Sequence, residues 1–114
     1  MLRIGIIGGI GPVSTVDYYK GIISRYRSIT GDSHYPIIII NSIDMTEMLS
    51  YVAARQYEIL TAFLLTAVES LKYAGADIAV IASNTPHVVF SQVQKKSSLP
   101  LISIVESAAE KAVA

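Results

Sequence analysis

The sequence predicts an α/β domain in which a four-stranded parallel sheet carries helices on both faces. Short apolar runs alternate with amphipathic stretches, which is the element order of a doubly wound sheet. The runs are continuously apolar rather than alternating, as is typical of parallel strands that are buried on both faces. The chain has 114 residues, 52% of them hydrophobic, which is enough for one compact core.

The N-terminal segment predicts a strand, a tight turn and a helix. Residues 3–7 are apolar and followed by glycines, as in a buried strand. The turn is "GGIGP" at 8–12, and Pro12 suits the first turn of a helix because its missing N–H costs nothing there. Residues 13–27 are expected to be helical, since apolar side chains recur at helical spacing. This stripe comprises Val16, Tyr19, Ile22, Ile23 and Tyr26.

The central segment predicts a second strand and a long helix. Residues 37–42, "IIIINS", follow a loop at 30–36 and have the β-branched composition of a covered parallel strand. Residues 43–51 are ambiguous and leave room for a short helix. Residues 53–74 predict a helix that ends at Gly75, a residue type common just after a helix. Its apolar stripe comprises Leu60, Phe63, Leu64, Ala67, Val68 and Leu71.

The C-terminal segment predicts two more strands, each followed by a helix. Residues 77–82 form the expected third strand, and residues 100–105 the fourth. Between them, residues 85–96 predict a helix whose opening Thr-Pro pair suits an N-cap and a first turn. A last helical pattern begins at residue 106. We therefore predict a single flavodoxin-like α/β domain over residues 1–114.

Composition excludes several classes of partner. The formal net charge is zero, and no basic run exceeds the Lys95-Lys96 pair, so a nucleic-acid partner is not expected. No apolar run approaches the ~18–20 residues that span a bilayer, so no membrane segment is expected. The first residues lack the order of a signal peptide, which favours a cytoplasmic protein.

Residue usage also limits the chemistry. The chain has no cysteine, which removes disulfides and thiolate chemistry from the sequence as it stands. The two histidines, His34 and His87, lie far apart in sequence, so no metal site is expected.

Three polar segments, at 8–12, 41–44 and 83–87, follow the first three strands and are expected to converge at one edge of the sheet. Ligands of doubly wound sheets bind at this carboxyl edge. The glycine turn has two readings: it lets strand and helix pack closely, or its amides hold a carboxylate or phosphate. It does not match the G-x-G-x-x-G pattern, because Ser14 occupies the third glycine position counted from Gly9.

The sharpest polar cluster is Ser83-Asn84-Thr85. Helix capping requires only Thr85, so Ser83 and Asn84 indicate a function. A serine nucleophile needs an activating base, and neither a Gly-x-Ser-x-Gly elbow nor an evident triad surrounds Ser83. His87 is read as a residue at the helix start that contacts ligand or solvent.

Together these motifs resemble the aspartate/glutamate racemase family. The matching stretches are "IGIIGGIGPVST" at the first turn, "INSIDM" at the second strand, "SNTPH" after the third strand, and "LPLISIVESA" near the end. The resemblance implies racemisation without pyridoxal phosphate or metal, so no cofactor is expected. It implies two cysteines, one from each of two similar domains, that exchange a proton with the α-carbon on opposite faces.

The resemblance assigns roles to residues of this chain. Ser83 falls at the position of the first proton-transfer cysteine, while Asn84 and Thr85 fall at carboxylate-binding positions. Ile10 takes the place of a methionine in the glycine turn, and Asn41 and Ser42 line the same cleft. The weaker candidates are Gly9, Gly11, Thr15, Arg55 and His87.

Three departures from the family pattern bear on activity. Ser83 is far less acidic than a thiol, and the sequence leaves open whether it is natural or an engineered replacement. The second domain, expected after Ala114, is absent from this chain. The position of a substrate-binding arginine in some aspartate-specific members is Met48, with Arg55 nearby.

We therefore expect a racemase-like domain with impaired activity that binds aspartate or glutamate, pairs with a second racemase domain and forms a homodimer. The alternative is a non-catalytic α/β module that binds a small carboxylate or phosphate at the same edge.

Overall fold

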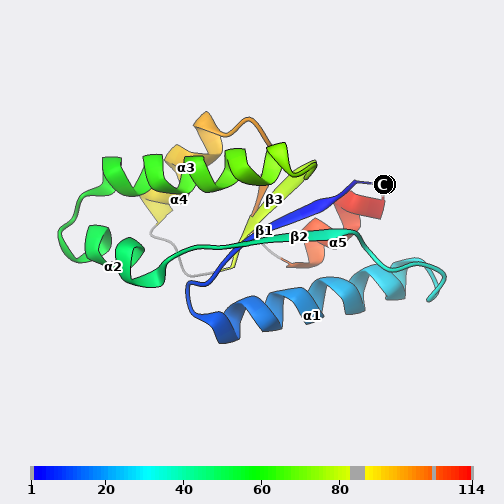
Figure 1. Cartoon of the computed structure of the whole chain (residues 1–114). Coiled ribbons are helices and arrows are strands. Elements are labelled where there is room, and N and C mark those ends of the chain that lie inside the picture. The colour runs from blue at the N-terminus through cyan, green and yellow to red at the C-terminus, as the bar shows by residue number, and fades with distance from the viewer. Residues whose placement is uncertain (1, 83–86, 104, 114) are drawn as a thin grey trace.

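The computed structural model describes residues 2–82, 87–103 and 105–113. A four-stranded parallel sheet with strand order β2-β1-β3-β4 runs through the molecule (Figure 1). This architecture confirms the predicted α/β class and the doubly wound parallel sheet. The elements are β1 Ile4–Gly8, α1 Pro12–Ile29, β2 Ile38–Ser42, α2 Met45–Ala53, α3 Tyr57–Tyr73, β3 Ile78–Ile81, α4 His87–Lys96, β4 Leu101–Ile102 and α5 Val105–Val113.

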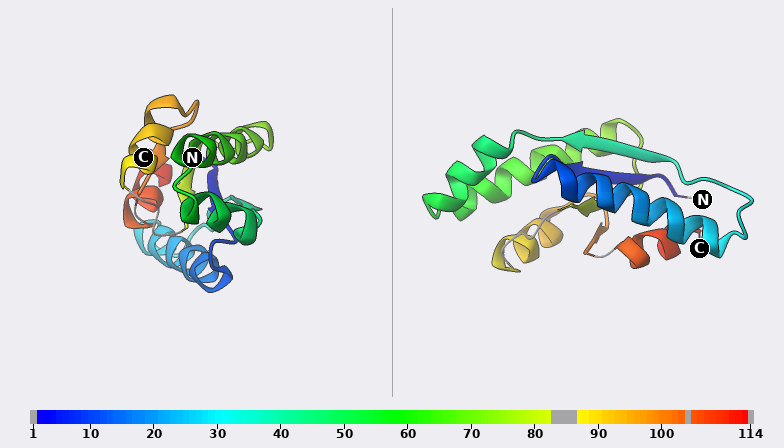
Figure 2. Two further views of the ribbon diagram at one scale, coloured as in Figure 1. Left: turned by 90° about the vertical axis from the view of Figure 1, so that its left-hand side faces the viewer. Right: turned by 90° about the horizontal axis from the view of Figure 1, so that it is seen from below.

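Helices cover both faces of the sheet (Figure 2). Side chains alternate along a strand, so Ile4 and Ile6 pack toward α1 and α5 while Ile7 packs toward α2, α3 and α4. The central strand β1 is buried throughout. Each fully buried isoleucine or leucine contributes roughly 1.5–3 kcal/mol through removal of its side chain from water, so the two cores hold the strand ends in place.

The buried stripe of α1 differs from the prediction. Ile22 and Tyr26 are buried as expected, but Val16 and Tyr19 are 49% and 42% exposed. Thr15 is buried instead. The helical period was right, but the buried face begins at Thr15 rather than Val16, and Thr15 is held against the glycine turn by hydrogen bonds.

The ambiguous segment after β2 forms the short helix α2, and the predicted start of α3 at residue 53 is wrong. Ala53 ends α2, and α3 begins at Tyr57. The break is a Schellman-type turn: the Arg55 N–H donates to the Val52 carbonyl at 3.1 Å, and the Gln56 N–H donates to the Tyr51 carbonyl at 2.9 Å. Neither glycine nor proline marks it, so the residue pattern gave no signal.

An Arg55→Gly variant should gain stability. Arg55 has φ 54°, a left-handed conformation that strains a residue with a side chain. Removing that strain, less the backbone entropy of glycine, should raise the free energy of unfolding by about 0.5–1 kcal/mol, measured by urea titration. Ala54→Gly is the matched control, since Ala54 has φ −84° and should lose stability. An equal loss in both variants would contradict this account.

The remaining ends follow the prediction in part. Gly75 has φ 105° and closes α3, as expected, with its N–H donating to the Lys72 carbonyl. β4 is shorter than predicted: it pairs with β3 at Leu101 and Ile102 only, and Val105 belongs to α5 rather than to the strand. β4 is an edge strand of the sheet, so β3 is the neighbouring strand whose pairing determines its length.

Candidate functional site at the carboxyl edge of the sheet

The first two polar segments meet at the carboxyl edge of the sheet, as predicted. The Ile43 N–H donates to the Gly8 carbonyl at 2.9 Å, which ties the end of β2 to the glycine turn. The Ala82 N–H donates to the Ile7 carbonyl at 2.9 Å, so the end of β3 lies on the other side of the same turn. The predictions for Ser83, Asn84, Thr85 and Pro86 fall outside the described residues. His87 opens α4, and the prediction for its side chain also lies outside them.

Gly9 is where the chain leaves β1, and only glycine fits there. Its φ is 88°, and an added Cβ would lie 2.5 Å from the Ile43 carbonyl oxygen and 2.7 Å from Ser42 Oγ. Both numbers are below any ordinary contact, so the turn passes directly against the end of β2. The close approach brings the Ser42 hydroxyl onto the glycine turn.

Thr15 fastens the glycine turn from inside helix α1. Its Oγ1 accepts the Gly9 N–H at 2.9 Å and donates to the Gly11 carbonyl at 3.4 Å. An added Cβ on Gly8 would meet Thr15 Cγ2 at 2.5 Å, so the threonine fills the space above β1. The Gly9 amide is thus already used by the protein. Thr15 is a positioning residue that holds the turn.

The outer side of the turn is open. An added Cβ on Gly11 would meet no described atom within 4 Å. Gly11 is the N-cap of α1 and provides no side-chain hydrogen bond to the helix, while Pro12 has no N–H. Within α1, the first amides able to bind an external acceptor are therefore those of Val13 and Ser14.

The other predicted edge residues differ in exposure. Ile10 is only 8% exposed and packs into the core beneath α2 and α3. Asn41 Nδ2 donates to the Ala67 carbonyl of α3 at 3.3 Å, so its amide is engaged away from the turn. Ser42 is exposed at the edge. Among the predicted polar residues Thr15, Asn41 and Ser42, the exposed one is therefore Ser42.

Met48 and Arg55, the two positions considered for binding a substrate carboxylate, lie away from the carboxyl edge of the sheet. Met48 is 3% exposed and belongs to the core, because α2 turns that side toward α3. Arg55 is exposed in the turn between α2 and α3, which Figure 1 places at the left extremity of the molecule, beyond the strand ends. Asp44 caps α2 by accepting the Thr46 N–H at 2.9 Å.

Glu47 is engaged along α2 rather than at the edge. Its carboxylate accepts the Tyr51 hydroxyl proton at 2.7 Å. This hydrogen bond holds the phenol in its protonated form, which raises the pKa of Tyr51 above its usual value.

The residue pattern did not reveal a groove between α3 and α4. This groove has a volume of about 530 Å³ and is lined by Tyr57, Glu58, Thr61, Val89, Gln92 and Lys96. Apart from the adjacent pair Tyr57 and Glu58, the lining residues are three or four apart within each helix, which signals a helix face but not an opening between two helices.

Two further searches concern metals and membranes. Within residues 2–82, 87–103 and 105–113, no group of three His, Cys, Asp or Glu side chains is placed to hold a metal ion. None of the helices in these ranges is long and apolar enough to cross a bilayer.

A doubly wound sheet whose carboxyl edge gathers a glycine turn, a helix N-terminus and small polar side chains defines an α/β domain of the kind that holds small ligands between strand ends. The chain belongs to the Asp/Glu/hydantoin racemase family, whose model matches residues 7–114. The family resemblance inferred from the motifs is therefore confirmed.

Three relatives illustrate the match. The chain is 30% identical to the broad specificity amino-acid racemase RacX of Bacillus subtilis (strain 168), over 90% of this chain and 46% of the relative. A crystal structure of a candidate Asp/Glu racemase from Yersinia pestis superposes with a TM-score of 0.82 at 33% identity, covering 90% of this chain and 45% of that one. An aspartate racemase homologue from Pyrococcus horikoshii OT3 superposes with a TM-score of 0.79 at 38% identity, covering 99% and 49%. The chain thus spans about half the length of these relatives.

Proposed function

We propose that this chain is one half of a cofactor-independent amino-acid racemase. In this proposal the substrate lies at the carboxyl edge of β1, β2 and β3, and a second α/β domain closes over it. The observation that carries the proposal is the junction of Gly9 with Ser42 and Ile43, which brings two of the three polar segments together at one edge. Family membership and the half-length match support it.

The described residues suggest how a substrate carboxylate is held. The amides of Val13 and Ser14 lie in the first turn of α1, where the helix dipole favours an anion. Ser42 is exposed beside the turn and offers a hydroxyl donor. The Asn84 and Thr85 side chains are proposed to complete the carboxylate site. Fixed donors of this kind also stabilise charge that develops when the α-proton leaves.

Proton transfer is proposed to take place at position 83. Inversion at the α-carbon needs one group that removes the proton and another that returns one on the opposite face, both within reach at once. A thiol performs this exchange because its pKa can be lowered toward neutrality. The Ser83 hydroxyl is a much weaker acid, so we propose that this half is impaired in that role. The second domain supplies the opposite group.

The first expected result is that the isolated chain does not interconvert L- and D-aspartate or L- and D-glutamate. The reasons are Ser83 and the missing opposite group. Chiral chromatography after prolonged incubation measures both directions. Racemisation above the buffer control by the isolated chain would overturn this part of the proposal.

The second expected result concerns a longer protein that contains this chain joined to its second domain. There, Ser83→Cys should raise the racemisation rate in both directions, because it restores a thiol at the proposed position. Ser83→Ala is the matched control and should remain at or below the level of the serine protein. An unchanged rate in the cysteine variant would show that position 83 is not a catalytic base.

One observation favours a second candidate function. The N-terminus of α1 has no side-chain cap from Gly11 and can bind an anion without any proton transfer. The alternative is a non-catalytic module for a small carboxylate or phosphate. Calorimetric titration with aspartate, glutamate and phosphate separates the two: phosphate binding with no amino-acid response would favour the module.

The biological setting completes the proposal. The substrate class is an acidic amino acid, aspartate or glutamate, and the protein acts in the cytoplasm without pyridoxal phosphate or metal. Its partners are a second racemase domain and a second copy of the same chain in a homodimer.

A further inference from the structure

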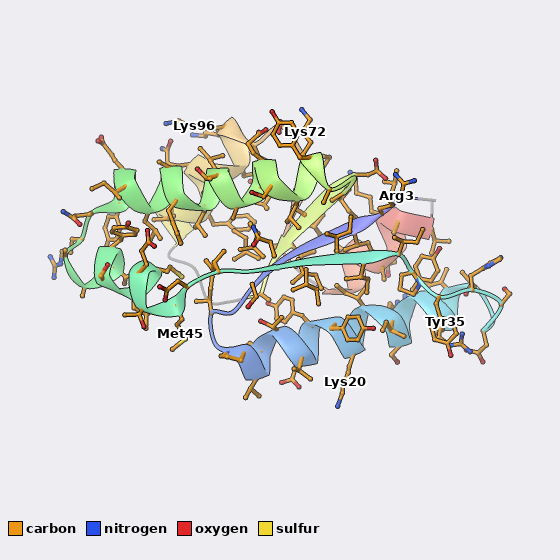
Figure 3. The ribbon with its side chains drawn as sticks, viewed as in Figure 1. Arg3, Lys20, Tyr35, Met45, Lys72 and Lys96 are labelled. Carbon is orange, nitrogen blue, oxygen red and sulfur yellow. The ribbon has the colours of Figure 1, made fainter. Side chains whose placement is uncertain are left out.

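The groove between α3 and α4 is a concave surface that the carboxyl-edge site does not use. Its lining comes from the first two turns of α3 and from one face of α4, and Figure 3 labels Lys96 at the end of α4. Its volume of about 530 Å³ falls within the range of roughly 300–1,000 Å³ that is usual for small-molecule sites. The groove is therefore large enough to hold a small molecule.

The floor of the groove is formed by its two buried lining residues, Thr61 of α3 and Val89 of α4. Thr61 is 6% exposed and Val89 is 1% exposed. The Thr61 hydroxyl donates to the Tyr57 carbonyl at 2.8 Å, so its proton is already used within the helix. A ligand therefore meets a floor without a free donor, on which an aliphatic group can be removed from water.

The rim of the groove carries one carboxylate and one ammonium group, those of the exposed residues Glu58 and Lys96. In the part of the chain that the structure describes, neither the Glu58 carboxylate nor the Lys96 ammonium forms an ion pair or a hydrogen bond. Each charge suits the end of its own helix, because Glu58 lies in the first turn of α3 and Lys96 in the last turn of α4. That preference explains the residue types but leaves both charges available to a ligand.

We propose that this groove binds a free α-amino acid with an aliphatic side chain. The Glu58 carboxylate accepts the α-ammonium group, and the Lys96 ammonium donates to the α-carboxylate. Gln92 lies one turn before Lys96 on α4 and offers an amide that both donates and accepts. The aliphatic side chain of the ligand lies over Thr61 and Val89. This site is additional to the racemase site of the proposed function and does not depend on it.

The two charges of the rim select this class of ligand. The lining of the groove has one acidic and one basic side chain and therefore no net charge. Lys96 would attract a phosphate but Glu58 would repel it, and a polyamine would be attracted by Glu58 and repelled by Lys96. A small molecule that carries one charge of each sign beside an aliphatic group matches both rim residues and the floor.

Nuclear magnetic resonance titration with L-leucine tests the proposal. Leucine should shift the amide signals of Thr61 and Val89 in a saturable manner. Two analogues are matched probes, because leucinamide lacks the carboxylate and N-acetylleucine lacks the ammonium group. Each analogue should bind about fivefold more weakly than leucine, since each loses one ion pair at an exposed rim. Inorganic phosphate should leave both amide signals unchanged.

Variants at the rim assign each charge of the ligand to one residue. Lys96→Met should weaken leucine binding about fivefold and remove the preference for leucine over leucinamide, because the carboxylate has then lost its partner. Glu58→Gln should likewise remove the preference for leucine over N-acetylleucine. Lys72→Met is the matched control: Lys72 is exposed on α3 but does not line the groove, so this variant should bind leucine as the wild type does.

Four results would each overturn the proposal. They are the absence of a saturable leucine response at Thr61 and Val89, equal binding of leucine and both analogues, a phosphate response in the groove, and leucine shifts confined to the carboxyl edge at Val13, Ser14 and Ser42. The analogues need only the wild-type chain, so the test stands even if a rim variant misfolds.

A longer protein that contains the second domain should give the same leucine response at Thr61 and Val89. Loss of the response there would show that the rest of the protein covers the groove, and it would also overturn the proposal. None of these measurements depends on racemase activity, so this proposal and the proposed function fail separately.

Discussion

A Gly9→Ala variant is expected to lose about 2–5 kcal/mol of the stability of the domain. The left-handed conformation at φ 88° strains any L side chain by about 1–2 kcal/mol. The new methyl group would also lie 2.5 Å from the Ile43 carbonyl oxygen, and such overpacking adds roughly 1–3 kcal/mol. Small domains are stable by only about 5–15 kcal/mol, so the loss should be evident in urea unfolding.

Gly31→Ala is the control that separates the two effects. Gly31 has φ 61°, but an added Cβ would meet no described atom within 4 Å. Its variant should show the conformational strain alone. The difference between the two variants then measures the contact between the glycine turn and the end of β2. Equal losses in Gly9→Ala and Gly31→Ala would mean that the contact is loose.

A Thr15→Val variant should have the second largest effect. Valine keeps the shape but removes the oxygen that accepts the Gly9 N–H, and Gly9 is buried. A buried donor left without a partner destabilises a protein by about 1–3 kcal/mol. The glycine turn should also loosen, with faster hydrogen exchange at the Gly9 amide.

Thr61→Val tests whether this loss reflects the orphaned donor. Thr61 is equally buried, but its hydroxyl donates to the Tyr57 carbonyl within α3. A helix carbonyl keeps its main-chain partner when that hydroxyl is removed, so the loss should stay below about 1 kcal/mol. A larger loss in Thr61→Val than in Thr15→Val would refute the role assigned to Thr15.

The sheet was predictable because its signal is local. Continuous β-branched runs such as residues 37–40 identify strands, and the alternation with helices predicts the parallel order. The expected burial of this strand on both faces is wrong, because β2 is a partly exposed edge strand. Gly75 marked the end of α3 for the same reason, since glycine readily adopts its left-handed conformation. The break at Arg55 was not predictable, because an arginine in that conformation leaves no compositional trace.

The location of the site was predictable from the sequence, but the roles of its individual side chains were predictable only in part. Topology alone brings the glycine turn and Ser42 to one edge. The engagement of Thr15 with the turn, and of Asn41 with α3, depends on side-chain directions that no spacing in the sequence encodes. The exposed flank of α1 was likewise missed, because an apolar stripe does not state which part of it remains uncovered.

The order of the strands also has a consequence during synthesis. β1 emerges from the ribosome before the other strands of this sheet, yet it lies in the middle of the sheet, where Ile4 pairs with Ile38 on one side and with Ile78 on the other. Its second partner emerges only after two further helices have been made. Pairing between distant segments is slow to form. Until β3 is made, the isoleucines of β1 lack one of their two neighbouring strands, and the apolar surface left exposed in that interval is prone to aggregation.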